Sequence, residues 1–248
     1  MNVQKNHLSR HSQARFATTH WSIVLAAGDK ADSHCVMALQ TLCRTYWYPL
    51  YAYIRHQGYG PQDAEDLIQS FFVFLLEKNR LESLVQDKGK FRSFLLTALN
   101  HFRVDQWKKG QSHKRGGGRS HLSLNIKDAE TRYAHEPVDT TTPEKLFEIN
   151  WAVTLLNTVF NTLQQEYQAK EQGKLFEKLN FCLTGQRSTL PYTQLATQLD
   201  LSEANIKVTI HRLRKRYREL LRQQVAHTVA TSEEVEEELR SLFKVLAY

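Results

Sequence analysis

The sequence predicts an all-α protein with two small helical domains joined by a flexible polar linker. Apolar residues recur at steps of three and four along several segments, which is the spacing of one face of an α-helix. No pair of segments shows the alternating pattern of paired strands. A polar, glycine-containing stretch near the middle of the 248 residues separates two groups of helical segments. We therefore expect two helical cores, one on each side of that stretch.

The first domain is expected over residues 20–109. An apolar stripe predicts a helix over 61–78, and Pro61 suits its first turn, where the missing N–H leaves no bond unmade. A second stripe predicts a helix over about 91–108. The aromatic run at 46–53 predicts that a further helix begins or passes there.

Residues 110–142 are expected to form the linker, because they are polar and rich in Gly and cationic residues. A flexible arm at 1–19 precedes the first domain. The second domain is expected over 143–229, with Thr142 as the N-cap of its first helix. Residues 230–248 form an acidic, amphipathic C-terminal helix in this prediction.

Residues 190–221 carry the pattern of a helix-turn-helix. A helix over 192–198 leads into a tight turn at 200–201, and Ser202 is placed to cap a second helix. Residues 203–222 hold seven Lys/Arg and two Glu, a local charge of +5. Such a helix fits the DNA major groove, with base edges near its N-terminal half and phosphates beside its cations. The alternative is a solvated surface helix. The outer face carries Lys207, His211, Arg212, Arg214, Lys215 and Arg218.

A second segment that suits nucleic acid lies at the end of the helix predicted over 91–108. There an aromatic ring is interleaved with cationic residues, a combination that favours unstacked bases and their backbone. The alternative is that Trp107 closes the helical bundle and the charges only solubilise the linker. The segment holds His101, Arg103, Trp107, Lys108 and Lys109.

Composition narrows the function classes. The chain has 33 Lys+Arg against 26 Asp+Glu, a net charge of +7, which favours a polyanionic partner. No run approaches the roughly 18 apolar residues of a membrane span, and the first residues lack the apolar core of a secretory signal. Cys35, Cys43 and Cys182 form no CxxC spacing, so we expect a reducing, cytoplasmic location without disulfides.

No catalytic residue, metal site or cofactor is predicted, and we expect the protein not to be an enzyme. The chain has no phosphate-binding glycine loop and no hydrolase motif. The acidic residues at 63–66, with His56 nearby, come nearest to a metal-ligand group. Acidic residues at a helix start are explained by the helix dipole instead.

Three segments, in this order, resemble the extracytoplasmic-function (ECF) group of bacterial RNA polymerase sigma factors, in the sigma-70 family. They are DAEDLIQSFFVFLLEK (63–78), FRSFLLTALNHFRVDQWKK (91–109) and the helix-turn-helix at 192–213. The likeness covers about residues 36–226. It implies a region 2-like bundle and a region 4-like helix-turn-helix. It also implies binding to the clamp coiled-coil and flap of core RNA polymerase, and transcription initiation at promoter DNA.

The resemblance implies roles for individual residues. The polymerase-binding positions are Asp63, Asp66, Gln69 and Phe72. The positions for the minus-ten promoter element are Phe91, Arg92, Asn100, His101, Asp105, Trp107, Lys108 and Lys109. The positions for the minus-thirty-five element are Ser202, Lys207, Val208, His211, Arg212 and Lys215.

Two questions stay open in the sequence. The first is whether the chain is instead a one-component regulator, with a ligand pocket or dimer contact in residues 20–109. A sigma factor would be a monomer when free, and an anti-sigma protein would be a further partner. The second is whether the acidic segment 230–248 folds back on the basic helix and weakens DNA binding, or caps the core of the second domain.

Overall fold

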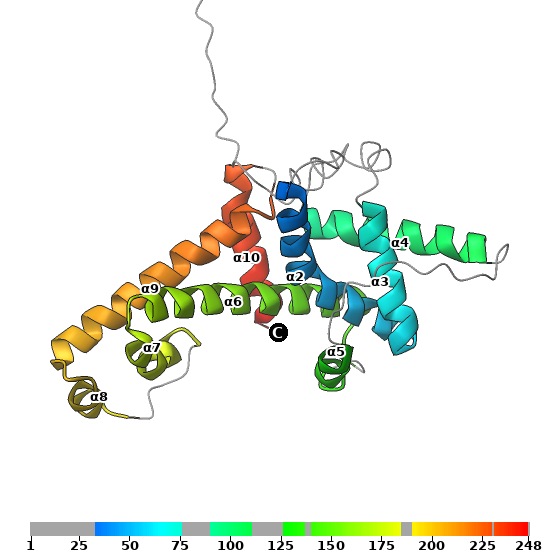
Figure 1. Ribbon diagram of the computed structural model, residues 1–248. Helices are drawn as coiled ribbons and strands as arrows, with labels where there is room; N and C mark the ends of the chain where they lie inside the picture. Colours follow the sequence, from blue (N-terminus) through cyan, green and yellow to red (C-terminus); the bar gives the residue numbers. More distant parts are fainter. Residues whose placement is uncertain are drawn as a thin grey trace, which may run out of the picture.

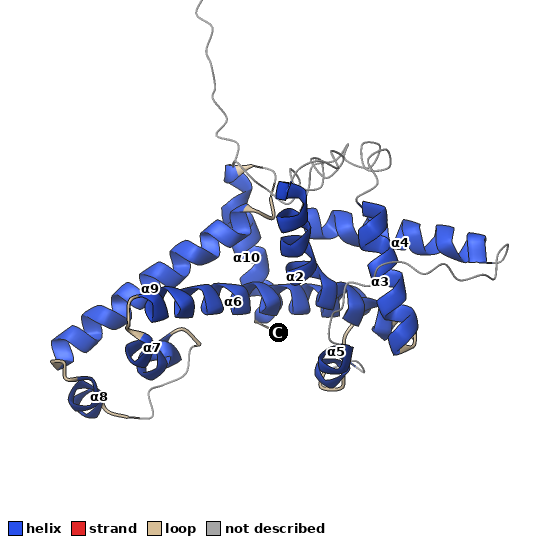
Figure 2. Ribbon diagram, viewed as in Figure 1, coloured by secondary structure: helices blue, strands red, loops and turns tan. Residues whose placement is uncertain are grey.

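The structure, a computed structural model, describes residues 33–75, 90–110, 126–136, 140–184, 190–229 and 231–247. Within these ranges the chain forms helices and turns and no strand (Figure 2), which confirms the all-α prediction. The arm predicted at 1–19 lies outside the described residues.

The first three described helices follow the predicted pattern. They are α2 (Ser33–His56), α3 (Pro61–Leu75) and α4 (Phe91–Gly110). The aromatic run at 46–53 lies inside α2, which continues through Pro49. Tyr46 and Tyr51 of this run are fully buried. The apolar stripes of α3 and α4 face the same core, as their spacing predicts.

Helix α5 (Ile126–Tyr133) lies within the segment predicted as a linker, and it corrects that prediction. Glu130 accepts hydrogen bonds from Nε and Nη2 of Arg55 in α2, at 2.8 and 2.9 Å. The Tyr51 hydroxyl also donates to Glu130, at 2.5 Å. Charged and polar contacts therefore dock α5, and such contacts leave no apolar stripe in the sequence.

Helix α6 (Pro143–Ala169) joins the two predicted domains. Thr142 is its N-cap and accepts a hydrogen bond from the backbone N–H of Lys145 at 3.2 Å, as predicted. The first half of α6 packs against α2, and the second half reaches α7 (Gly173–Leu179) and α9 (Glu203–Ala226) (Figure 1). The ring of Phe147 meets Tyr53 of α2 at 6.4 Å. The buried residues of the two sets of helices form one continuous cluster along α6.

Of the remaining helices, α7, α9 and α10 pack on α6, and α8 packs on α9. Helix α10 packs on both α6 and α9. No helix in the described part of the chain is long and apolar enough to cross a membrane. The helices that follow α6 in the chain are α7 (Gly173–Leu179), η2 (Asn180–Cys182), α8 (Tyr192–Leu199), α9 (Glu203–Ala226), η3 (Ser232–Glu234) and α10 (Val235–Leu246).

Candidate nucleic-acid interface

The helix-turn-helix forms where the sequence predicts it, between α8 and α9. Asp200 ends α8 in the left-handed conformation at φ 52°, which Asp adopts more readily than most residues. The N–H of Leu201 then donates to the carbonyl of Ala196 at 2.9 Å. Ser202 caps α9 by accepting from the N–H of Asn205 at 3.2 Å. The turn therefore fixes α8 across the start of α9.

The two faces of α9 differ as the sequence predicts. Ile206 and Leu213 are fully buried, whereas Val208, between them in sequence, is 47% exposed. No ion pair joins Lys207 or Arg212 to another described residue. The start of α9 thus offers cations, hydroxyl and methyl groups to a partner. The exposed predicted residues are Ser202, Lys207, Val208, His211, Arg212 and Lys215.

Other cations of α9 serve as anchors, a role that the sequence did not reveal. Arg216 pairs with Glu166 of α6, with Nη2 at 2.5 Å from Oε1. Their hydrogen bond raises the pKa of Arg216 and lowers the pKa of Glu166. Arg214 donates from Nε to the carbonyl of Cys182 at 3.2 Å. Arg222 pairs with Glu236 of α10. These contacts hold α9 to α6, η2 and α10.

The predicted minus-ten residues divide between the two ends of α4. His101 and Asp105 are exposed in the second half of the helix. Asn100 is half-buried and donates from Nδ2 to the Tyr53 hydroxyl at 3.0 Å. The backbone of Trp107, Lys108 and Lys109 continues α4, while their side chains lie outside the described residues. The second half of α4 therefore remains a candidate surface.

Phe91 and Arg92, at the start of α4, are buried, with 0% and 2% of their surface exposed. The Phe91 N–H donates to the carbonyl of Thr228, which follows α9, at 3.3 Å. The guanidinium of Arg92 lies over the ring of Trp151, 4.4 Å from its centroid. Burial lowers the pKa of Arg92. In this arrangement both side chains are buried, although the resemblance assigns both to the minus-ten surface.

The predicted polymerase-binding residues also differ in their exposure to solvent. Asp63 and Asp66 are exposed on α3, and Gln69 is half-buried and donates to Glu65 Oε1 at 3.0 Å. Phe72 is 2% exposed and lies in the core. Phe72 therefore supports α3 from inside, and the predicted residues that reach the surface of this helix are the polar ones.

The described residues hold no group of three or more His, Cys, Asp or Glu that could bind a metal ion. The two candidate surfaces lie at opposite ends of the molecule: α8 and the start of α9 at one end, and the end of α4 at the other (Figure 1).

Comparison with protein families identifies the chain. The family model described as "ECF sigma factor" matches residues 55–223, from the end of α2 into α9. No curated protein and no solved structure matches the chain. The matched range includes α3, α4 and the helix-turn-helix, the segments on which the resemblance depends. The chain therefore belongs to the ECF sigma factor family and acts as a sigma factor in transcription initiation.

Proposed function

We propose that this sigma factor recognises the minus-thirty-five element with α9 and the minus-ten element with the second half of α4. Core RNA polymerase and promoter DNA are the partners of the family. The observation that carries the proposal is the division of α9 into an apolar face toward the core and an exposed cationic face at its start.

The start of α9 has the chemistry for reading base edges. A guanidinium such as that of Arg212 can donate two hydrogen bonds to guanine, and the methyl groups of Val208 can contact a thymine methyl. The hydroxyl of Ser202 and the ammonium groups of Lys207 and Lys215 suit phosphate oxygens or base acceptors, and His211 adds a further donor. Cationic contacts of this kind make the affinity fall steeply with added salt.

The second half of α4 has the chemistry for unstacked bases. His101, Asp105 and the segment 107–109 combine a charged side chain, ring systems and cations on one helical run. Asn100 is already bonded to Tyr53, so we assign it to holding α4 on α2. Arg92 and Phe91 contribute to this site only if the start of α4 is uncovered.

Polymerase binding is proposed for the polar edge of α3. Asp63 and Asp66 are exposed there, and Gln69 lies one turn further along the helix. We propose that this edge meets the clamp coiled-coil and that the α8–α9 unit meets the flap. The predicted cytoplasmic location agrees with these partners.

The proposal is tested by footprinting the holoenzyme on promoter DNA with wild type, Lys207→Ala, and the double variant His101→Ala/Asp105→Ala. Loss of protection at the upstream element alone for the first variant, and at the downstream element alone for the second, is expected. Lys174→Ala changes an exposed lysine of α7 and serves as the matched charge control.

Two results would contradict this assignment. One is an unchanged footprint in both variants. The other is a free chain that forms a dimer and protects a symmetric site without polymerase, which is the behaviour of a one-component regulator.

A further inference from the structure

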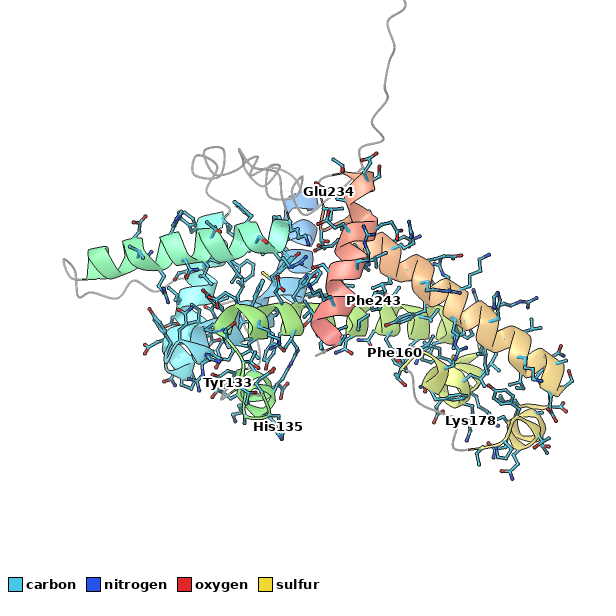
Figure 3. The ribbon with its side chains drawn as sticks, turned by 180° about the vertical axis from the view of Figure 1, so that it is seen from behind. Tyr133, His135, Phe160, Lys178, Glu234 and Phe243 are labelled. Atoms are coloured by element: carbon cyan, nitrogen blue, oxygen red, sulfur yellow. The ribbon has the colours of Figure 1, made fainter. Side chains whose placement is uncertain are left out.

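The C-terminal helix α10 lies between the start of α4 and the second half of α9, across α6 (Figure 3). Its apolar residues Val235, Leu239 and Leu242 are buried. On α9 it reaches Arg222, which pairs with Glu236, and leaves the exposed residues from Lys207 to Lys215 uncovered. The acidic segment thus caps a core and does not cover the DNA-facing start of α9.

The contact between α10 and α4 is a buried ion pair. Glu238 has 1% of its side chain exposed and pairs with Arg92, which has 3% exposed. Lys90 approaches the same carboxylate, with Nζ 3.2 Å from Oε2 of Glu238. Arg92 also donates from Nη2 to the hydroxyl of Ser241 in α10, at 2.9 Å. Two cations at the start of α4 therefore share one buried carboxylate of α10. Arg92 has a second partner in Glu148 of α6, with Nε 3.4 Å from Oε1, and Lys90 has a second partner in Glu237, at 3.9 Å.

Both charges lie on the apolar face of their own helix. Arg92 precedes Leu95 by three residues and Leu99 by seven, and Glu238 precedes Leu242 by four. A pair of well-packed apolar residues at such positions would often be as stable or more stable. The charged pair instead makes the contact specific, because each partner is costly to bury without the other.

The same pair makes the contact reversible. If α10 withdraws as a unit, Glu238 and Lys90 return to water and Arg92 keeps Glu148 of α6 as a partner, so no charge stays buried without compensation. Withdrawal also uncovers two cations beside a helix start, which is a favourable place for phosphate groups. The closed arrangement and a DNA-bound arrangement therefore compete for the same cations.

We propose that α10 is an intramolecular latch: Glu238 holds Arg92 and Lys90 against the core, and its release frees them for promoter phosphates. This inference rests on the proposed function, since it assigns a regulation to the same α4 surface. It also accounts for the burial of Arg92, which the family resemblance places among the minus-ten residues.

Hydrogen–deuterium exchange on the full chain tests the latch directly, without DNA. Glu238→Gln removes the buried charge. Glu236→Gln is the matched control, because its partner Arg222 and Glu236 itself are both more than half exposed. We expect Glu238→Gln to speed exchange about tenfold or more in segments 90–95 and 235–246, with segment 173–179 unchanged. Exchange in these segments equal to that of Glu236→Gln would overturn the latch.

Promoter binding by the holoenzyme is the second readout. If closed chains are the majority, opening them raises the apparent affinity in proportion to the binding-competent fraction. We expect binding by Glu238→Gln to be about threefold tighter or more than by wild type or Glu236→Gln. Weaker binding by a variant whose segment 173–179 stays protected would contradict an inhibitory latch.

A third comparison uses wild-type chain alone. It tests the latch even if Glu238→Gln exchanges rapidly in every segment, which would mean that this variant is unfolded. Wild-type chain is compared free and in its complex with core polymerase and promoter. The latch predicts faster exchange of 235–246 in the complex, whereas equal or slower exchange overturns it. If no complex forms, the proposed function fails, while the exchange of the free chains still tests the contact itself.

Discussion

Arg216 of α9 donates two hydrogen bonds to the carboxylate of Glu166 in α6, from Nε at 2.9 Å and from Nη2 at 2.5 Å. Arg216 lies in the second half of α9, beyond the exposed residues at its start, and binds no DNA in our proposal. This forked pair, with the bond from Arg214 to η2, orients α9 on the long helix that also carries α2. Some cations of α9 are thus structural, and the net charge of the helix overstates its DNA-facing charge.

We expect Arg216→Ala to lower the free energy of unfolding by about 1 kcal/mol or less, because both side chains of the pair with Glu166 are partly exposed. Urea unfolding of the full chain measures the loss. Arg218→Ala, which removes an exposed cation of the same helix, is the control. An equal loss in both variants would mean that the two hydrogen bonds from Arg216 to Glu166 do not contribute to the free energy of unfolding.

The docking of α5 predicts a pH dependence. The hydrogen bond from Arg55 holds the pKa of Glu130 below its ordinary value of 4.5. Its contribution to stability is therefore complete above that value and is lost as the pH falls through the lower pKa of the folded chain. Below about pH 4.5, urea unfolding should show a steeper loss of stability in wild type than in Glu130→Gln. If the free energy of unfolding falls equally with pH in the two proteins, the bond between Arg55 and Glu130 does not stabilise the docking of α5.

The N-cap of α6 predicts that stability depends on a hydrogen-bond acceptor in the side chain of residue 142 and not on the size of that side chain. Thr142→Ala removes the acceptor for the Lys145 N–H and should lower the free energy of unfolding by about 1 kcal/mol. Thr142→Asp keeps an acceptor beside the positive end of the helix dipole and should retain most of the stability. Thermal unfolding of the three proteins makes the comparison. A loss as large in Thr142→Asp as in Thr142→Ala would rule the cap out.

The exposed guanidinium of Arg212 predicts an effect on promoter sequence preference. If it reads a base, Arg212→Ala should weaken promoter binding by about 1–3 kcal/mol and relax the preference at one position. Holoenzyme binding to a set of promoter variants measures both quantities, with Lys174→Ala as the control. Equal weakening on every sequence would make Arg212 a phosphate contact instead.

Periodicity and capping residues predicted the fold well where local sequence decides it. The stripes of α3, α4 and α9 and the caps Thr142 and Ser202 all lie where the pattern indicates. Periodicity does not reveal helix α5, because Ala129 is its one buried apolar residue among those described and polar contacts hold the helix in place. Such contacts leave no periodic signal.

The candidate site was predictable on its exposed faces and not where charges are buried. The family resemblance assigns Arg92 to the minus-ten surface, whereas its side chain is buried in this structure. Its partner Glu238 is 146 residues away in the chain, and nothing local connects the two. The available signal was that each lies on the apolar face of its own helix.

Transcription in vitro tests the central claim most directly. The purified chain is added to core RNA polymerase on a library of promoter sequences, with each component omitted in turn. A sigma factor predicts transcripts that start at a defined set of promoters and only when both components are present. A folded chain that binds the core polymerase but starts no transcript would contradict the account.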